Sequence, residues 1–135
     1  MQQANKILLV DDDREDQAIF QDAFVDLGEA NLVHYEENGE LALKFLEQCY
    51  LANALPVLII LDLNMPKLNG TQTLQAIKND ERYKDIVVII YSTTLNPLEK
   101  EKCIQLGAKD FVIKPLVYTE LMLIAKYFKK LCDTI

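Results

Sequence analysis

The fold is decided by a short stretch, VLIILD at residues 57–62, in which five apolar residues lead directly into a carboxylate. A strand without polar alternation is expected to be covered on both faces, as in a parallel sheet. Three similar runs also end in a polar or charged residue: Ile7–Val10 before Asp11, Val87–Tyr91 before Ser92, and Phe111–Ile113 before Lys114. Because ligands bind at the carboxyl ends of such strands, the four runs predict a reaction site at one edge of a parallel sheet.

Helical patterns separate these runs and predict five strand–helix units. Asp13, Asn38 and Asn96 are suited to cap helix starts, Glu99 completes a predicted capping box with Asn96, and Gly28 is suited to end the first helix. A weaker strand is expected at residues 31–35, and the last helix from about 117 to 132. Alternating strands and helices indicate parallel β-α-β units. We predict an α/β fold: a doubly wound five-stranded parallel sheet in a flavodoxin-like (βα)5 three-layer sandwich.

Length and composition limit the classes of function. The 135 residues are expected to form one domain, with a core from about 6 to 131 and no output domain. A net charge of −7 argues against nucleic-acid binding and fits cations or basic partner surfaces. No apolar run approaches the length of a membrane span, and nothing resembles a signal peptide. The three cysteines have no metal-ligand spacing, so we expect core residues of a cytoplasmic protein.

The carboxylates at the strand ends are suited to phosphoryl chemistry. Asp62 follows a buried strand, and a rigidly held carboxylate can act as a nucleophile that carries a covalent phosphoryl group. Asp11 and Asp12 are expected beside it, where three carboxylates repel one another. A hard divalent cation relieves that repulsion, and oxygen-only ligands favour Mg²⁺. The backbone carbonyl of Asn64 can add a further ligand.

Two further strand ends supply a positive charge and a hydroxyl. Lys114 and Ser92 are suited to stabilise the charge that develops during phosphoryl transfer.

Each assignment of a site residue has an ordinary structural alternative. Asp11 and Asp12 can form a solvated acidic turn, Asp62 can begin a loop, Ser92 can be a turn residue, and Lys114 an exposed lysine. For Asp13 we prefer the structural interpretation, a helix cap.

The motifs in this order resemble the receiver domain of two-component response regulators of the stand-alone, CheY-like type. They are an acidic pair after the first strand, Asp-x-Asn-Met-Pro at residues 62–66, Ser-Thr at 92–93 and Lys-Pro at 114–115. The resemblance extends from Lys6 to about Leu131. It implies that Asp62 is the phospho-acceptor and that Asp11, Asp12, Asp62 and the Asn64 carbonyl bind Mg²⁺. It further implies that Ser92 is the switch hydroxyl, Lys114 contacts the phosphoryl group, Phe111 is the aromatic switch, and the Lys114–Pro115 bond is cis.

By this resemblance, the chain takes a phosphoryl group from a sensor histidine kinase or a histidine phosphotransfer protein and signals by a change of its surface. It catalyses only its own phosphorylation and dephosphorylation. By the same resemblance, the face of the fourth helix, fifth strand and fifth helix is expected to contact a downstream protein or a second copy. The helical spacing places Leu123 and Tyr127, with Leu116 at compatible spacing, beside the core stripe of the last helix, where they form either such a contact face or ordinary edge packing. Two alternatives stay open: a phosphate-independent adaptor, and a phosphatase with an aspartyl nucleophile. Asn64 disfavours the phosphatase, because it replaces the expected general acid.

Overall fold

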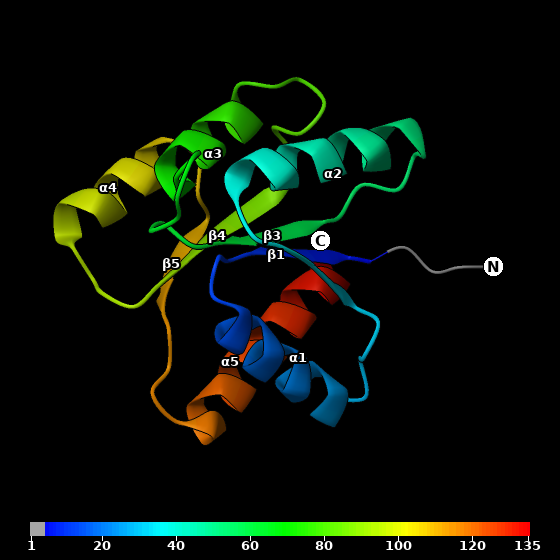
Figure 1. The fold of residues 1–135 in the computed structure, drawn as a ribbon, viewed down its shortest axis with the longest axis vertical. Helices are drawn as coiled ribbons and strands as arrows, with labels where there is room; N and C mark the ends of the chain where they lie inside the picture. The colour runs from blue at the N-terminus through cyan, green and yellow to red at the C-terminus, as the bar shows by residue number, and fades with distance from the viewer. Residues whose placement is uncertain (1–4) are drawn as a thin grey trace.

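The computed structural model describes residues 5–135 and contains one five-stranded parallel sheet with five helices (Figure 1). The strand order is β2-β1-β3-β4-β5. The strands are β1 (Ile7–Val10), β2 (Val33–Glu36), β3 (Leu58–Leu61), β4 (Val87–Ser92) and β5 (Asp110–Ile113). The helices are α1 (Arg14–Asp26), α2 (Gly39–Leu51), α3 (Gly70–Lys78), α4 (Pro97–Gln105) and α5 (Tyr118–Thr134). This topology confirms the predicted doubly wound fold.

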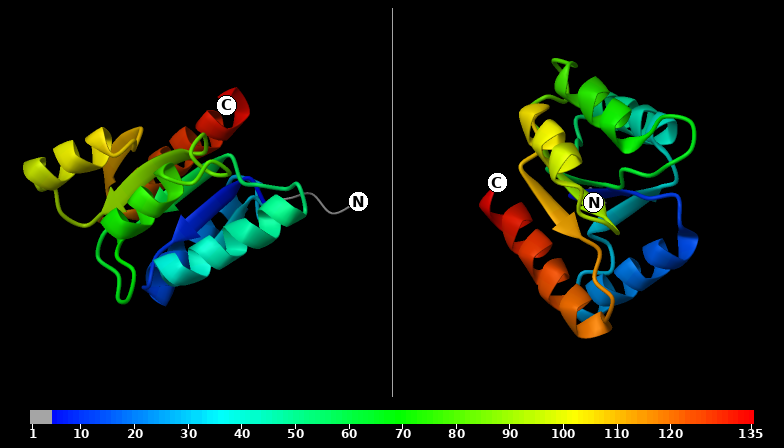
Figure 2. Two further views of the ribbon diagram at one scale, coloured as in Figure 1. Left: turned by 90° about the horizontal axis from the view of Figure 1, so that it is seen from above. Right: turned by 90° about the vertical axis from the view of Figure 1, so that its left-hand side faces the viewer.

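Helices cover both faces of the sheet, so the molecule has three layers (Figure 2). Helices α1 and α5 lie on one face, and α2, α3 and α4 lie on the other. Successive side chains of a strand point to opposite faces. In the central strand β3, Leu58 and Ile60 therefore pack toward α1 and α5, while Ile59 and Leu61 pack toward the other three helices. This two-sided burial explains why the strand sequence is uniformly apolar.

Polar side chains fix the starts of four helices. Asp13 accepts hydrogen bonds from the first turn of α1, and Asn38 accepts from the first turn of α2, as predicted. Asn96 caps α4, but Glu99 does not return a bond to it, so the capping box predicted there is wrong. The exposed Glu99 carboxylate stays in solvent. The complete capping box belongs instead to α3, between Asn69 and Gln72.

The start of α3 is pressed against the end of β3. Gly70 is the first residue of α3, and a Cβ placed on it would lie 2.2 Å from the carbonyl oxygen of Asp62 and 2.5 Å from the Cα of Leu63. The Gly70 N–H also donates to the carbonyl oxygen of Leu63 at 3.1 Å. A residue without a side chain is therefore required here, and the helix holds the backbone around Asp62 in place.

Candidate functional site

The carboxyl ends of four parallel strands bring the predicted site residues to one edge of the sheet. Asp11 follows β1, Asp62 follows β3, Ser92 ends β4, and Lys114 follows β5. Asp11, Asp62 and Ser92 are buried, with residue exposures of 0%, 6% and 1%. The strand ends therefore place charged and polar groups in a region where protein replaces most of the water.

Lys114 is at the centre of this group. Its Nζ lies 2.8 Å from Oδ2 of Asp11, 2.9 Å from Oδ2 of Asp16 and 3.5 Å from Oδ2 of Asp62. The Tyr91 ring packs on the same ammonium, with its centroid 5.6 Å from Nζ. Only 10% of the Lys114 side chain is exposed, so the alternative of a solvated lysine is wrong. The ammonium is held by charge and by an aromatic face.

Three carboxylates lie close enough to share one cation. Oxygen atoms of Asp11, Asp12 and Asp62 all lie within 4.8 Å of one another. Asp12 is exposed while the other two are buried, so the cluster is open to solvent on one side. A purely oxygen-based ligand set fits a hard divalent cation such as Mg²⁺. The chemistry of these ligands therefore fits the predicted metal.

Backbone donors orient two of these carboxylates. The Asn64 N–H donates to Oδ1 of Asp62 at 3.2 Å, and the Asp13 N–H donates to Oδ1 of Asp11 at 2.9 Å. The Gln17 side chain donates to the Asp11 carbonyl oxygen at 2.7 Å, which ties α1 to the end of β1. Asp13 itself caps α1, in agreement with the structural interpretation preferred from sequence.

Burial shifts the ionisation of the reactive groups. It raises the pKa of Asp11 from 3.8 to about 6, although hydrogen bonds from Lys114 and from the Asp13 backbone oppose the shift. Burial also raises the pKa of Asp62, against the opposing charge of Lys114. For Lys114, burial favours the neutral amine, but hydrogen bonds to Asp11 and Asp16 outweigh it and raise the pKa. The lysine is therefore a permanent cation at neutral pH.

Asp11→Asn is expected to stabilise the protein in metal-free buffer at pH 7 by up to about 3 kcal/mol. The pKa of Asp11 is higher in the folded state, so the folded protein holds this proton more tightly than the unfolded chain does. The stability that comes from this proton is fully present below about pH 4 and is lost as the pH rises through about 6, where folded Asp11 ionises. Asparagine removes the carboxylate that causes this loss. Urea unfolding between pH 4 and 8 measures the difference, which should vanish at pH 4. Asp12→Asn, at the exposed neighbour, is the control and should change stability little.

Ser92 and Phe111 project from the same face of the sheet. Ile90 is in register with Phe111, and Ser92 follows Ile90 by two residues on β4. Phe111 is 7% exposed and packs in the core beneath α4. The Ser92 carbonyl oxygen accepts from the Lys114 N–H at 2.7 Å, which joins the ends of β4 and β5. Ser92 and Phe111, the two residues predicted to move together, therefore lie on the same face of the sheet on neighbouring strands.

The predicted cis bond between Lys114 and Pro115 is wrong. No peptide bond is cis among residues 5–135. The trans isomer is intrinsically preferred before proline by about 0.5–1 kcal/mol. With a trans bond, the Lys114 N–H still reaches Ser92 and its ammonium still reaches Asp11. The local contacts therefore do not require the less favoured isomer.

Sequence reasoning missed Asp16 and Tyr91 as members of the site. The pattern identifies Asp16 only as an acidic residue of the first helical turn, and Tyr91 only as an apolar strand residue. Both reach Lys114, from α1 and from β4 respectively. Asp16 and Lys114 are 98 residues apart, so only the packing of α1 beside the end of β5 reveals the contact.

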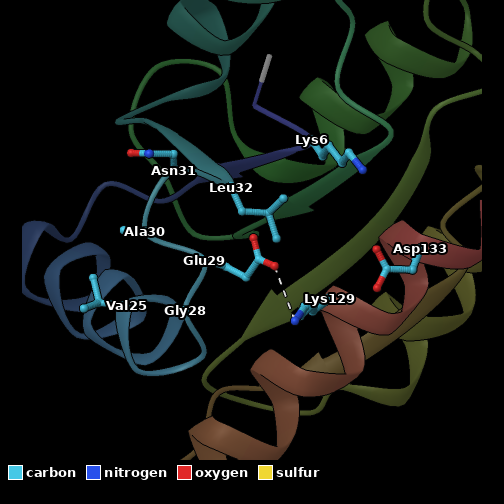
Figure 3. A pocket seen from close by; sticks show the side chains of 9 residues that line it. All are labelled: Lys6, Val25, Gly28, Glu29, Ala30, Asn31, Leu32, Lys129 and Asp133. Atoms are coloured by element: carbon cyan, nitrogen blue, oxygen red, sulfur yellow. Dashed lines mark ion pairs between the residues drawn. The ribbon is translucent and has the colours of Figure 1, made fainter. Parts of the chain in front are cut away.

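A separate cavity of about 450 Å³ lies at the other end of the sheet (Figure 3). Lys6 before β1 and Leu32 before β2 border it, together with Lys129 and Asp133 near the end of α5. Glu29 forms an ion pair with Lys129 at 3.3 Å across this cavity (Figure 3). The cavity is therefore remote from the carboxylates at the opposite strand ends.

Comparisons with known proteins agree on one family. A family model described as the response regulator receiver domain matches residues 7–126. The chain is 29% identical over 110 residues to the chemotaxis protein CheY1 of Helicobacter pylori, covering 82% of this chain and 85% of CheY1. It is similar to the phosphorylated cyanobacterial phytochrome response regulator RcpA, with 30% identity, a TM-score of 0.83 and coverage of 94% and 92% of the two chains. The Mn²⁺-bound response regulator Rcp1 gives 27% identity, a TM-score of 0.76 and coverage of 91% and 90%.

Proposed function

Because the chain belongs to the family of response regulator receiver domains, we propose that Asp62 accepts a phosphoryl group from a phosphohistidine. Receiver domains are signalling phosphoacceptors that interact with histidine kinases and phosphotransfer proteins. One observation of this chain carries the proposal: the buried Asp62 carboxylate lies beside Lys114 and within 4.8 Å of Asp11 and Asp12. If Asp62 only began a loop, there would be no reason for a buried lysine and two further carboxylates to lie beside it.

The residues of the chain divide the work of transfer. A carboxylate oxygen of Asp62 forms the new P–O bond as the P–N bond to the histidine breaks, and the imidazole keeps the electron pair of that bond. The Asn64 N–H restrains the nucleophile through its bond to Oδ1. Lys114 lies on the Oδ2 side, where a permanent positive charge stabilises phosphoryl oxygens. The rate of transfer increases because these groups are held in position before the phosphoryl donor binds.

Asp11, Asp12, Asp62 and the backbone carbonyl of Asn64 would hold the metal ion, which we propose is Mg²⁺. Once bound, it would neutralise charge on the phosphoryl oxygens. The Mn²⁺-bound form of Rcp1 supports a divalent cation in a protein of the same fold. The oxygen-only ligands of this chain favour Mg²⁺ over softer metals.

We assign the conformational response to Ser92 and Phe111. The Ser92 hydroxyl ends β4 beside the acceptor, and its Oγ accepts from the Thr94 N–H at 3.5 Å, a long and weak bond. The hydroxyl proton takes no part in this accepted bond, so it is available to donate to a phosphoryl oxygen. Phe111 packs on the same face of the sheet, beneath α4. A shift of Ser92 toward the phosphoryl group would change the space available to the Phe111 ring.

We propose two contact surfaces for protein partners. A cavity of about 340 Å³ between α1 and the β5–α5 segment borders Lys114 and suits the phosphoryl donor. The face of α4, β5 and α5 suits a downstream protein or a second copy of the chain. On its flank, Leu123 and Tyr127 lie one turn apart on α5 and are 68% and 37% exposed, whereas Leu116, which is 96% exposed, borders the cavity beside Lys114. Exposed large apolar side chains that lie close together often mark interaction surfaces.

We further propose that this receiver domain works in the cytoplasm. Three free cysteines suit a reducing compartment. Among residues 5–135, no helix is both long and apolar enough to cross a bilayer.

Incubation with Mg²⁺ and acetyl phosphate is expected to add one phosphoryl group, which Asp62→Asn abolishes. The amide cannot form the acyl phosphate, and every other group of the site is kept. Intact mass spectrometry measures the gain, and treatment with hydroxylamine should remove it. Asp133→Asn, at an exposed aspartate near the end of α5, is the matched control and should still gain the mass. An unmodified wild type would favour the adaptor, and steady release of phosphate from small esters would favour the phosphatase.

A further inference from the structure

We infer that Asp16 competes with the phosphoryl group for Lys114 and thereby limits how readily Asp62 is phosphorylated. The inference rests on the proposed function and concerns the regulation of the same site. Three carboxylates share the Lys114 ammonium at unequal distances. The Lys114 Nζ lies 2.8 Å from Asp11 and 2.9 Å from Asp16, but 3.5 Å from Asp62. The acceptor is the most distant of the three carboxylates from the cation that would stabilise its product.

The Asp16 carboxylate has no other structural task among residues 5–135. The start of α1 is already capped by Asp13, which accepts from the N–H groups of Glu15 and Asp16. The cation cluster consists of Asp11, Asp12 and Asp62. Within the described part of the chain, the Asp16 side chain accepts a hydrogen bond only from Lys114. Its contact with the lysine is therefore an addition to a site that is complete without it.

Burial distinguishes the two carboxylates that hold Lys114 most closely. The Asp11 side chain is fully buried, whereas 38% of the Asp16 side chain is exposed. Water can replace the lysine as a partner for Asp16, but it cannot do so for Asp11. When a phosphoryl group arrives on Asp62, the contact with Asp16 is the one that can be released at lower cost. Asp16 is thus placed as the exchangeable partner of Lys114.

Asp16 has two opposing effects on Lys114: it can orient the ammonium, and it offsets the positive charge. An ammonium has three N–H donors, so Asp16 could simply orient the lysine. However, Asp11 and the Tyr91 ring also hold Lys114, so its orientation survives without Asp16. The negative charge of Asp16, in contrast, offsets the charge of Lys114 directly and repels every anionic donor that approaches. The charge effect therefore exceeds the orienting effect, and Asp16 acts as a brake.

Asp16→Asn is expected to raise the rate of phosphorylation of Asp62 by acetyl phosphate about fivefold. Asparagine keeps the shape and an oxygen that accepts from Lys114, so the variant isolates the charge. Intact mass spectrometry over time measures the rate at saturating Mg²⁺. Glu15→Gln removes the same charge from the same helical turn without touching Lys114 and should leave the rate near that of the wild type. Asp16→Glu restores the carboxylate and should return the rate toward the wild-type value.

The charge of the donor provides a readout that a merely structural role would not change. Acetyl phosphate carries more negative charge than phosphoramidate at neutral pH, so the acceleration by Asp16→Asn should be larger with acetyl phosphate. Equal effects on both donors, or an unchanged or slower rate in Asp16→Asn, would overturn the inference. A wild type that takes up phosphoryl groups in those experiments keeps the proposed function intact, whereas a wild type that takes up none overturns both.

Discussion

Gly70→Ala is expected to lower the free energy of unfolding by about 3 kcal/mol and to slow phosphorylation of Asp62 about a hundredfold. The added Cβ would lie 2.2 Å from the carbonyl oxygen of Asp62 and 2.5 Å from the Cα of Leu63. Both atoms belong to the backbone, so no flexible side chain can move aside. Either α3 moves away or the segment that carries the acceptor moves, and a displacement of about 1 Å at a reacting group can cost a factor of a hundred.

Gly28→Ala provides the matched control for Gly70→Ala. Gly28 ends α1 with a φ of +76°, and a Cβ there would meet no atom within 4 Å. The substitution costs about 1 kcal/mol, because an L-residue is strained in that conformation. Urea unfolding and the rate of mass gain with acetyl phosphate measure both variants. A phosphorylation rate that falls equally in the two would show that the approach of α3 to Asp62 is not what matters.

Lys114→Met is expected to destabilise the protein by about 3 kcal/mol at pH 7 and to slow phosphorylation by at least about a hundredfold. The variant keeps the bulk of the side chain but leaves the fully buried Asp11 carboxylate without its cation. An uncompensated buried charge accounts for the loss of stability. The loss should be smaller at pH 5, because Asp11, whose pKa is already raised to about 6, then takes up a proton. Urea unfolding at the two pH values and the rate of mass gain provide the measurements.

A second substitution separates the two consequences of Lys114→Met. In the double variant with Asp11→Asn, the buried charge is removed, so most of the lost stability should return. Phosphorylation should stay slow, because the cation beside Asp62 is still missing. Lys109→Met is the control, because it makes the same lysine-to-methionine change at an exposed position just before β5. It should change neither the stability nor the phosphorylation rate much. If the double variant were as unstable as Lys114→Met alone, the buried Asp11 charge would not be the cause.

Periodicity was sufficient to predict the architecture. Uniformly apolar runs predicted β1, β3 and β4, and the side chains of Asp13, Asn38 and Asn96 predicted three helix starts. Boundaries were less accurate where the pattern was weak. The strand expected at residues 31–35 is β2, which runs from Val33 to Glu36 at the edge of the sheet.

The site could be predicted where chemistry coincides with strand ends. Asp11, Asp62, Ser92 and Lys114 each follow or end an apolar run, and parallel pairing brings them together. The contact of Asp16 with Lys114 could not be predicted this way, because it depends on how α1 packs beside the end of β5. The close approach of Gly70 is also a property of packing, because a glycine in a loop pattern is equally consistent with an ordinary turn.

The order of strands in the sheet has a consequence for the nascent chain as it leaves the ribosome. Strand β1 pairs with β2 and β3, and β4 and β5 then extend the β3 side in the order in which they are synthesised. Domains generally fold as units. A nascent chain that ended before β5 would bring Asp11 and Asp62 together without Lys114, and the repulsion between their carboxylates would oppose such a partial sheet. The arrival of β5 brings Lys114 into place, so the last strand both completes the sheet and offsets part of the negative charge of the pocket.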